Sequence, residues 1–213
     1  MTSPIVLHKG GHSQEQCADG QRCLFEWYNW LTRQQNTDKC PPGVSPVLHR
    51  FGMRLNDVLP DGKRQELVQF LPNGDDRLAG TGHDGLDETR GYMALDWLIR
   101  TYTPAWLDLA GLNAEAAALR DFRRIADLSA AQAVRPHVLA GRDKAAAAGA
   151  AAGAAAGAAA WDVAGAAARA AAWDVAGAAA GAAADQILAP VVAMLQDSVI
   201  ALYDQMITGR WPS

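Results

Sequence analysis

A tract of forty residues, 145–184, constrains this chain more than any other feature. It contains 27 Ala, 6 Gly and seven other residues, arranged as GAAA blocks and two copies of WDVAGAAA. Alanine has the highest helix propensity of the amino acids and carries almost no side-chain chemistry. The tract therefore predicts helix, and forty helical residues would span about 60 Å. Such a helix either projects from the rest of the chain or folds back at a glycine.

The composition of the 213-residue chain changes near Lys144. We expect a compact helical body over 1–143, an Ala/Gly-rich helical arm over 144–186 and a C-terminal amphipathic helix with a short tail over 187–213. A body of this size lies within the usual range for one domain. Because the bulky aliphatic residues concentrate outside the tract, the arm adds length but little core.

The first part of the body has clear helix signals. Residues 13–16 fit a capping box, and apolar residues then recur with helical spacing to about residue 33, which predicts one helix. Ser45 can cap a second helix that has Pro46 at its first position and continues to about residue 57.

Helical signals continue through the rest of the body. A third helix covers the apolar residues at 67–71, and a long one begins after the loop at 80–85 until Pro104 kinks or breaks it. Gly111 fits a C-cap, and Ser129 begins a capping-box pattern that leads into the arm. Since no segment shows the alternation of a strand, the predicted fold class is all-α.

The residues after the tract predict a packing helix. Its apolar residues recur at alternating steps of four and three: Leu188, Val192, Leu195, Val199, Leu202 and Met206. This two-heptad seam can pack on the body of the same chain or on a second copy. Two heptads are short for a self-sufficient coiled coil, which favours the chain's own body.

The spacing within the tract restricts its uses. Glycine and the other marked residues recur every four positions, and each step advances about 40° around a helix, so the row spirals. GxxxG spacing at Gly149, Gly153 and Gly157 favours a short close crossing with another backbone. The tract lacks the Leu, Ile and Phe of a membrane span and the regularly spaced Thr of an ice-binding helix. A spacer without a selected role remains the alternative.

The net charge of −4 comes from interspersed acidic and basic residues. No basic stripe of the kind that binds a phosphate backbone is present, so we expect no nucleic-acid partner. The N-terminus lacks the basic and apolar regions of a secretory signal, which predicts a cytoplasmic protein without a membrane anchor. In that compartment the three cysteines are expected to be free thiols.

One N-terminal cluster has residue types that bind metals: His8, His12, Cys17, Cys23 and Cys40. Within it, His12, Cys23 and Cys40 are the candidate ligands of a zinc site, which is the alternative to a protein without a cofactor. Five residues separate Cys17 from Cys23, more than the two to four of common zinc modules. Cys23 also lies on an apolar stripe, where a cysteine behaves as a small buried hydrophobe.

Acidic and amide side chains lie within or beside the apolar helical segments: Glu26, Asn56, Asp57 and Asp96. They could meet as inward carboxylates, but capping, pairing with a nearby arginine or exposure to water is favoured. An enzyme would require His12, Cys23, Glu26 and Asp57 to converge in one pocket. We expect the isolated histidines, His49, His83 and His137, to be satisfied or exposed. No P-loop, dinucleotide or Gly-x-Ser-x-Gly motif occurs.

Five groups of residues occur in a characteristic order. They are Gly11-His12-Ser13; Cys23-Leu24-x-Glu26; Cys40-Pro41 with Ser45-Pro46-Val47; Asn56-Asp57-x-Leu59-Pro60-Asp61; and Ala94-x-Asp96-Trp97 with Pro104-Ala105-Trp106-Leu107-x-Leu109-Ala110-Gly111-Leu112. This order resembles a family of uncharacterised bacterial proteins from high-GC genomes that also have alanine-rich C-termini. The resemblance covers roughly residues 10–130 and implies one helical unit with a variable tail, without implying an activity, cofactor or partner. Cys17 lies outside the pattern, which argues against a three-cysteine metal site.

These features predict a non-catalytic interaction or assembly protein. Its Ala/Gly-rich helix would serve as a spacer or as a close-packing surface. The expected partner is a second copy, bound through the Ala/Gly-rich or the C-terminal helix, and no cofactor is expected. The alternative is a zinc-binding protein or an enzyme with a site in the N-terminal His/Cys cluster.

Overall fold

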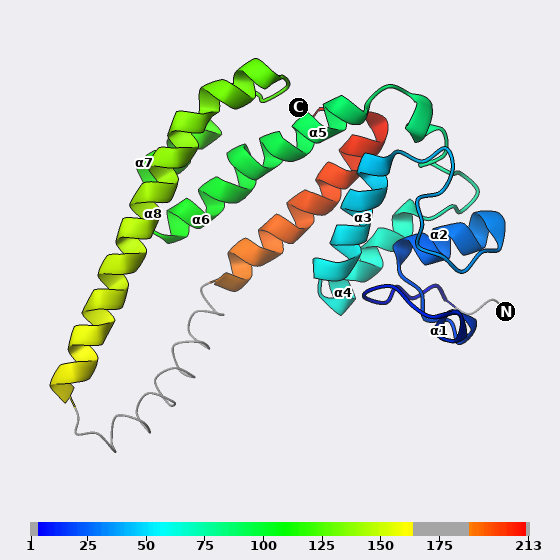
Figure 1. Cartoon of the computed structure of the whole chain (residues 1–213), viewed down its shortest axis with the longest axis horizontal. Helices are drawn as coiled ribbons and strands as arrows, with labels where there is room; N and C mark the ends of the chain where they lie inside the picture. Colours follow the sequence, from blue (N-terminus) through cyan, green and yellow to red (C-terminus); the bar gives the residue numbers. More distant parts are fainter. Residues whose placement is uncertain (1–3, 164–187, 212–213) are drawn as a thin grey trace. The chain divides into compact units, whose positions relative to one another are not determined.

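The computed structural model describes residues 4–163 and 188–211, which fold mainly into helices joined by turns and loops (Figure 1). In these two ranges, β-type pairing is limited to an isolated parallel bridge between Leu7 and Arg22. The all-α fold class predicted from the sequence is confirmed.

The chain divides into two compact units. Unit 1 comprises Met1–Leu95 and Gln196–Ser213, and unit 2 comprises Asp96–Leu195. The boundaries predicted at residues 143 and 186 mark changes in amino-acid composition, whereas the two units are defined by contacts between residues. The predicted boundaries therefore stay a prediction.

The helices of unit 1 are α1 (Gln14–Ala18), α2 (Leu24–Arg33), α3 (Pro46–Val58), α4 (Asp61–Arg64), the 3-10 helices η1 (Gln65–Phe70) and η2 (Thr81–His83), and most of α5 (Asp87–Trp97). Unit 2 contains the π-helix η3 (Leu98–Tyr102), α6 (Thr103–Leu109), α7 (Asn113–Arg120) and α8 (Leu128–Val163). Residues 188–208 are also helical, and those from 196 onward belong to unit 1.

The single helix predicted between residues 13 and 33 is two helices. α1 ends at a turn in which Gly20 has a φ of 86°, a left-handed conformation that favours glycine. Cys23 then serves as the N-cap of α2, and Glu26 completes a second capping box. The prediction was wrong here because two signals were assigned to one helix. The capping box at Ser13 begins α1, whereas the apolar stripe belongs to α2.

The predicted start of α3 is confirmed. The Ser45 hydroxyl accepts hydrogen bonds from the N–H groups of Val47 and Leu48, both at 3.2 Å, and Pro46 occupies the first turn. Proline costs no hydrogen bond there, because a first-turn N–H has no partner within the helix.

Pro104 neither breaks its helix nor stands at a simple kink. The turn before it widens into the π-helix η3, in which the N–H of Thr103 donates to the carbonyl of Leu98. The Thr103 hydroxyl donates to the same carbonyl at 2.7 Å. Since proline has no N–H and its ring crowds the carbonyl four residues earlier, a wider turn accommodates it.

The C-terminal helix completes the core of unit 1 and lies beside α3 (Figure 1). Tyr203 is fully buried, its hydroxyl donates to the Leu48 carbonyl at 3.2 Å, and its ring lies edge-on to Phe70 with centroids 4.9 Å apart. Gly52 allows this approach, because a Cβ there would stand 2.6 Å from the Tyr203 hydroxyl oxygen. A side chain at Gly52 would therefore push the two helices apart.

Buried Arg90 fixes the end of the C-terminal helix in unit 1. Its Nε donates to the Met206 carbonyl at 2.9 Å and its Nη1 to the Thr81 carbonyl at 3.0 Å. The Asp84 carboxylate pairs with the same guanidinium. Arg90 thus satisfies a carbonyl that the end of the helix leaves open and brings a positive charge to that end.

In unit 2, two aspartates organise the approach to α8. Asp96 accepts the Ile125 N–H at 2.8 Å, which closes the loop before the helix. Asp127 accepts the Ala130 N–H at 2.6 Å, so the cap comes from Asp127 rather than from Ser129 as predicted. α8 then continues for 36 residues and includes Pro136 within its length.

Candidate functional site

Three hydrogen-bond donors converge on the carboxylate of Glu26, which is buried within unit 1. Oε1 accepts the backbone N–H of His12 at 2.7 Å, and Oε2 accepts the backbone N–H of Cys23 at 2.8 Å. His12 Nδ1 lies 2.7 Å from the same Oε2. Because both oxygens accept backbone N–H groups, the carboxylate acts as an acceptor and the His12 ring places its proton on Nδ1. In neutral His12 the lone pair is then on Nε2.

The surroundings of Glu26 favour its ionised form. Burial raises the pKa of this carboxyl group, but the hydrogen bonds from Cys23 and His12 lower it by more, so its pKa falls below the usual value. Glu26 is therefore charged at neutral pH and binds the loop before α1 through charge-assisted hydrogen bonds.

Asn56 and Asp57 bind the same loop through its backbone. The Asn56 side chain accepts the Leu24 N–H at 3.1 Å and donates to the His8 carbonyl at 2.9 Å. Asp57 accepts the Gly10 N–H at 3.0 Å. These residues act as caps and loop anchors, as the sequence favoured, and not as a group of carboxylates facing one another.

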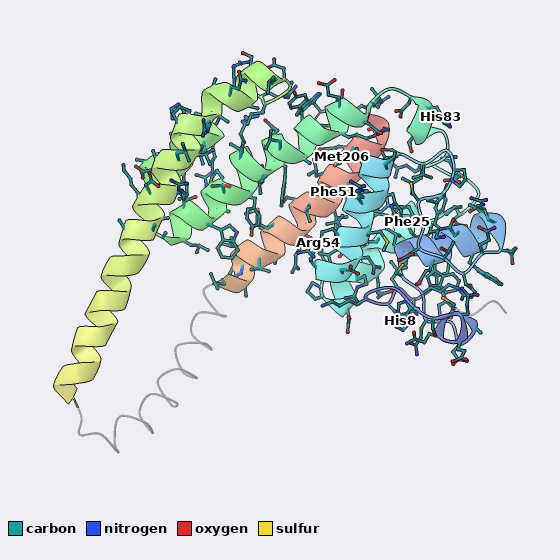
Figure 2. The ribbon with its side chains drawn as sticks, in the orientation of Figure 1. His8, Phe25, Phe51, Arg54, His83 and Met206 are labelled. Atoms are coloured by element: carbon teal, nitrogen blue, oxygen red, sulfur yellow. The ribbon has the colours of Figure 1, made fainter. Side chains whose placement is uncertain are left out.

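His8 is the histidine that lies next to His12. The two rings meet edge to face, with centroids 6.0 Å apart and planes at 81°. Figure 2 shows His8 on the N-terminal loop of unit 1, well separated from His83. The structure therefore brings together the two histidines of the predicted N-terminal cluster.

The cysteines of that cluster have different environments. Cys23 is fully buried, and burial raises the pKa of its thiol to about 12. Burial also raises the pKa of Cys17. Cys40 is exposed, and its sulfur lies 3.5 Å from the Val44 carbonyl oxygen. A protonated, buried thiol is a poor nucleophile and a poor metal ligand.

Among the residues that the structure describes, no group of three or more His, Cys, Asp and Glu side chains is arranged to hold a metal ion. The predicted zinc set of His12, Cys23 and Cys40 gains no support from this geometry and stays a prediction. Of the residues that an enzyme would require, His12 and Cys23 meet at Glu26, although Cys23 does so through its backbone.

The other histidines have the surroundings expected of them. His49 bonds the Asp38 carbonyl at 2.7 Å through Nε2 and lies against the ring of Phe25. His83 and His137 are exposed. None of the three lies at Glu26.

Gln65 is a functional residue that no sequence pattern singled out. Its side chain accepts the Leu7 N–H at 2.8 Å and donates to the Leu7 carbonyl at 3.0 Å. Gln65 thus binds both backbone polar groups of Leu7 and anchors the N-terminal loop. A single glutamine carries no pattern that would reveal a partner 58 positions away.

α8 offers a second candidate site, a helix surface in unit 2. Its first part is packed: Ala130 and Val134 are buried, and a Cβ on Gly141 would lie 3.4 Å from Leu107. Lys144 forms an ion pair with Glu115 of α7. The helix then enters the Ala/Gly tract and continues to Val163. The remainder of the tract, 164–184, and the residues up to 187 lie outside the described residues.

No helix within 4–163 or 188–211 combines the length and apolar character needed to cross a bilayer. The chain matches no protein-family model, no curated protein and no solved structure. The resemblance to an uncharacterised bacterial family therefore rests on the sequence motifs alone.

Proposed function

We propose that this is a non-catalytic assembly protein whose Ala/Gly-rich helix packs against the same helix of a second copy. The observation that carries the proposal is the continuity of α8, which passes from Leu128 to Val163 through Gly149, Gly153 and Gly157. A row of small residues that lies within one helix can bring two backbones close together.

The beginning of α8 is anchored within its own unit. Ala130 and Val134 are buried, and the ion pair between Lys144 and Glu115 marks the point where the ordinary sequence ends and the tract begins. In Figure 1 the yellow part of α8 continues beyond α6 and α7. An anchored helix that extends in this way presents its far part to a partner at a fixed angle to its own unit.

The composition of the extended part limits how it can bind. Alanine and glycine bury little apolar area, so a side-chain interface of ordinary strength is not available to residues 145–160. Three glycines also cost about 3 kcal/mol of helix stability relative to alanine. Close backbone contact, with dispersion and Cα–H···O interactions, is the interaction that such a surface can offer.

The test compares two variants with the same number of added leucines. The variant Gly149→Leu, Gly153→Leu, Gly157→Leu fills the row of glycines. The control, Ala147→Leu, Ala151→Leu, Ala155→Leu, places its leucines two positions earlier, about 200° around the helix. Molar mass is measured by size-exclusion chromatography with light scattering over a range of protein concentrations.

We expect the wild-type chain and the control to form a dimer or higher oligomer, and the glycine variant to be monomeric. A wild-type chain that stays monomeric at all concentrations contradicts the proposal and favours a spacer. Equal loss of assembly in both variants contradicts it as well, because the glycine row would then have no special part in the interface.

A further inference from the structure

His12 has one ring nitrogen, Nε2, that Glu26 does not contact. The His12 side chain is 7% exposed, and its Nδ1 is held by Glu26. Among the described residues, Nε2 makes no hydrogen bond or ion pair. His12 as a whole residue is only partly buried, so its ring lies near the surface of unit 1.

The neighbouring His8 is fixed in place through its backbone. Its N–H donates to the Arg22 carbonyl at 2.9 Å, and its carbonyl accepts from Asn56 at 2.9 Å. Within the described part of the chain its ring makes no hydrogen bond, and the ring contact that it does make is with His12 at 6.0 Å. The two imidazole rings thus lie next to each other, edge to face. Hydrogen bonds to the backbone of each histidine hold it in place.

We propose that His8 and His12 form a binding site for a divalent transition-metal ion of the class that prefers imidazole ligands, such as Zn²⁺, with Glu26 as the positioning residue for the His12 ring. A carboxylate that accepts the Nδ1 proton of a histidine fixes the ring and directs the Nε2 lone pair outward, as in histidines that bind metals. Two imidazoles on one tetrahedral Zn²⁺, each with a Zn–N bond of about 2.0–2.1 Å, have ring centroids about 5 Å apart. The rings of His8 and His12 are 6.0 Å apart and would approach by about 1 Å to share the ion.

This site replaces the two cysteines of the predicted set with His8. The Cys23 thiol is fully buried, and Cys40 takes no part in the hydrogen bonds around Glu26. With two protein ligands, a tetrahedral ion keeps two positions for water or for further ligands. The inference is independent of the assembly proposed for α8.

The test is equilibrium dialysis of the full chain, stripped with a chelator, against Zn²⁺ alone. We expect one Zn²⁺ per chain at the site. His8→Ala should weaken binding at least tenfold without unfolding the protein, because the His8 ring makes no hydrogen bond. Glu26→Gln should weaken binding about 10-fold to 100-fold, the usual effect of removing an outer-shell partner.

Two control variants separate this site from others on the surface. His83→Ala and Cys40→Ser change exposed groups with metal affinity, and both should bind Zn²⁺ as the wild type does. Long-range ¹⁵N–¹H spectra of the histidine rings provide a second readout, in which Zn²⁺ should shift Nε2 of His12 and leave Nδ1 protonated. Absence of binding, equal binding by His8→Ala, or loss of binding in Cys40→Ser alone would overturn the proposal.

Discussion

At the scale of single residues, Gly52 of α3 has no room for a side chain. A Cβ at this position would stand 2.6 Å from the Tyr203 hydroxyl oxygen and 2.9 Å from a ring carbon of Phe25. Gly52→Ala should therefore destabilise the protein by about 1–3 kcal/mol through overpacking, although alanine is the better helix former. Urea unfolding of the variant and the wild type measures the difference.

Two further variants test the cause of this loss. Gly91→Ala lies in α5 with nothing within 4 Å of its added Cβ, so it should stabilise the protein by about 0.5–1 kcal/mol. Tyr203→Phe removes the nearest atom, so Gly52→Ala should cost less in that background. If Gly52→Ala and Gly91→Ala have the same sign, the close contact does not determine the stability at Gly52.

Asp84 provides a residue-scale prediction about pH. Hydrogen bonds from Arg90 lower the pKa of this carboxyl group below its usual value. A lowered pKa in the folded state means that Asp84 stabilises the fold above its unfolded-state pKa of about 3.9, and that this contribution disappears as pH falls through the folded-state pKa. Asp84→Asn should therefore lower stability at neutral pH, and the difference from wild type should shrink toward pH of about 2.

Urea midpoints measured across this pH range test the prediction. Glu88→Gln is the matched control, because Glu88 is an exposed carboxylate in the first turn of α5. It should change the midpoint little at any pH. A constant difference between Asp84→Asn and wild type would show that the ionisation of Asp84 is not what stabilises Arg90.

The candidate site shows which residue contacts a sequence can reveal. The capping box between Cys23 and Glu26 spans three positions, so local spacing is enough to suggest it. The bond from Glu26 to His12 joins residues 14 positions apart, and those from Gln65 to Leu7 join residues 58 apart. Only the fold determines such pairs. The residue types at the site were predictable, but the pairing of His8 with His12 was not.

At the scale of elements, the predictions succeeded where the local chemistry has one meaning. Ser45 followed by Pro46 fits a helix start and little else, and α3 begins there. Pro104 has several structural outcomes, and the choice of a π-helix depended on hydrogen bonds from Thr103. The single helix predicted between residues 13 and 33 is divided at Gly20, a residue type that can also lie within a helix.

α8 allows a prediction in which two effects have opposite signs. Gly149→Ala, Gly153→Ala, Gly157→Ala should raise the helix content, since each change favours helix by about 0.8–1 kcal/mol. If the glycine row packs against a second copy, the three added methyl groups should also weaken self-association. Circular dichroism measures the first effect and light scattering the second. A gain in helix content without any loss of assembly would indicate that the glycines serve no interface.

At the scale of the whole molecule, the two ends of the sequence form one unit. Residues 4–95 and 196–211 share a core, whereas the Ala/Gly tract belongs to the part of the sequence between them. Composition located the boundary of the tract but carried no information about which helix completes which core. That assignment required Tyr203 and Arg90, whose contacts join residues more than 100 positions apart.

A chain that ends at Leu195 should lose the native core of unit 1. The truncation removes Tyr203, which is fully buried against α3, and the Met206 carbonyl that accepts from Arg90. Buried Arg90 would then lack part of its hydrogen bonding, which adds to the lost apolar contacts. Amide hydrogen exchange in α3 and η1 is the measurement, and we expect protection there to fall to the level of local unfolding.

Two full-length variants distinguish loss of this core from a general effect of truncation. Tyr203→Ala should destabilise unit 1 by about 3–5 kcal/mol, the usual cost of deleting a large buried aromatic side chain. Ala201→Ser changes an exposed position of the same helix and should leave exchange in α3 unchanged. If α3 keeps its protection in the truncated chain, residues 1–95 fold without the C-terminal helix. That helix would then be available to pack elsewhere, including on a second copy, as its heptad seam allows.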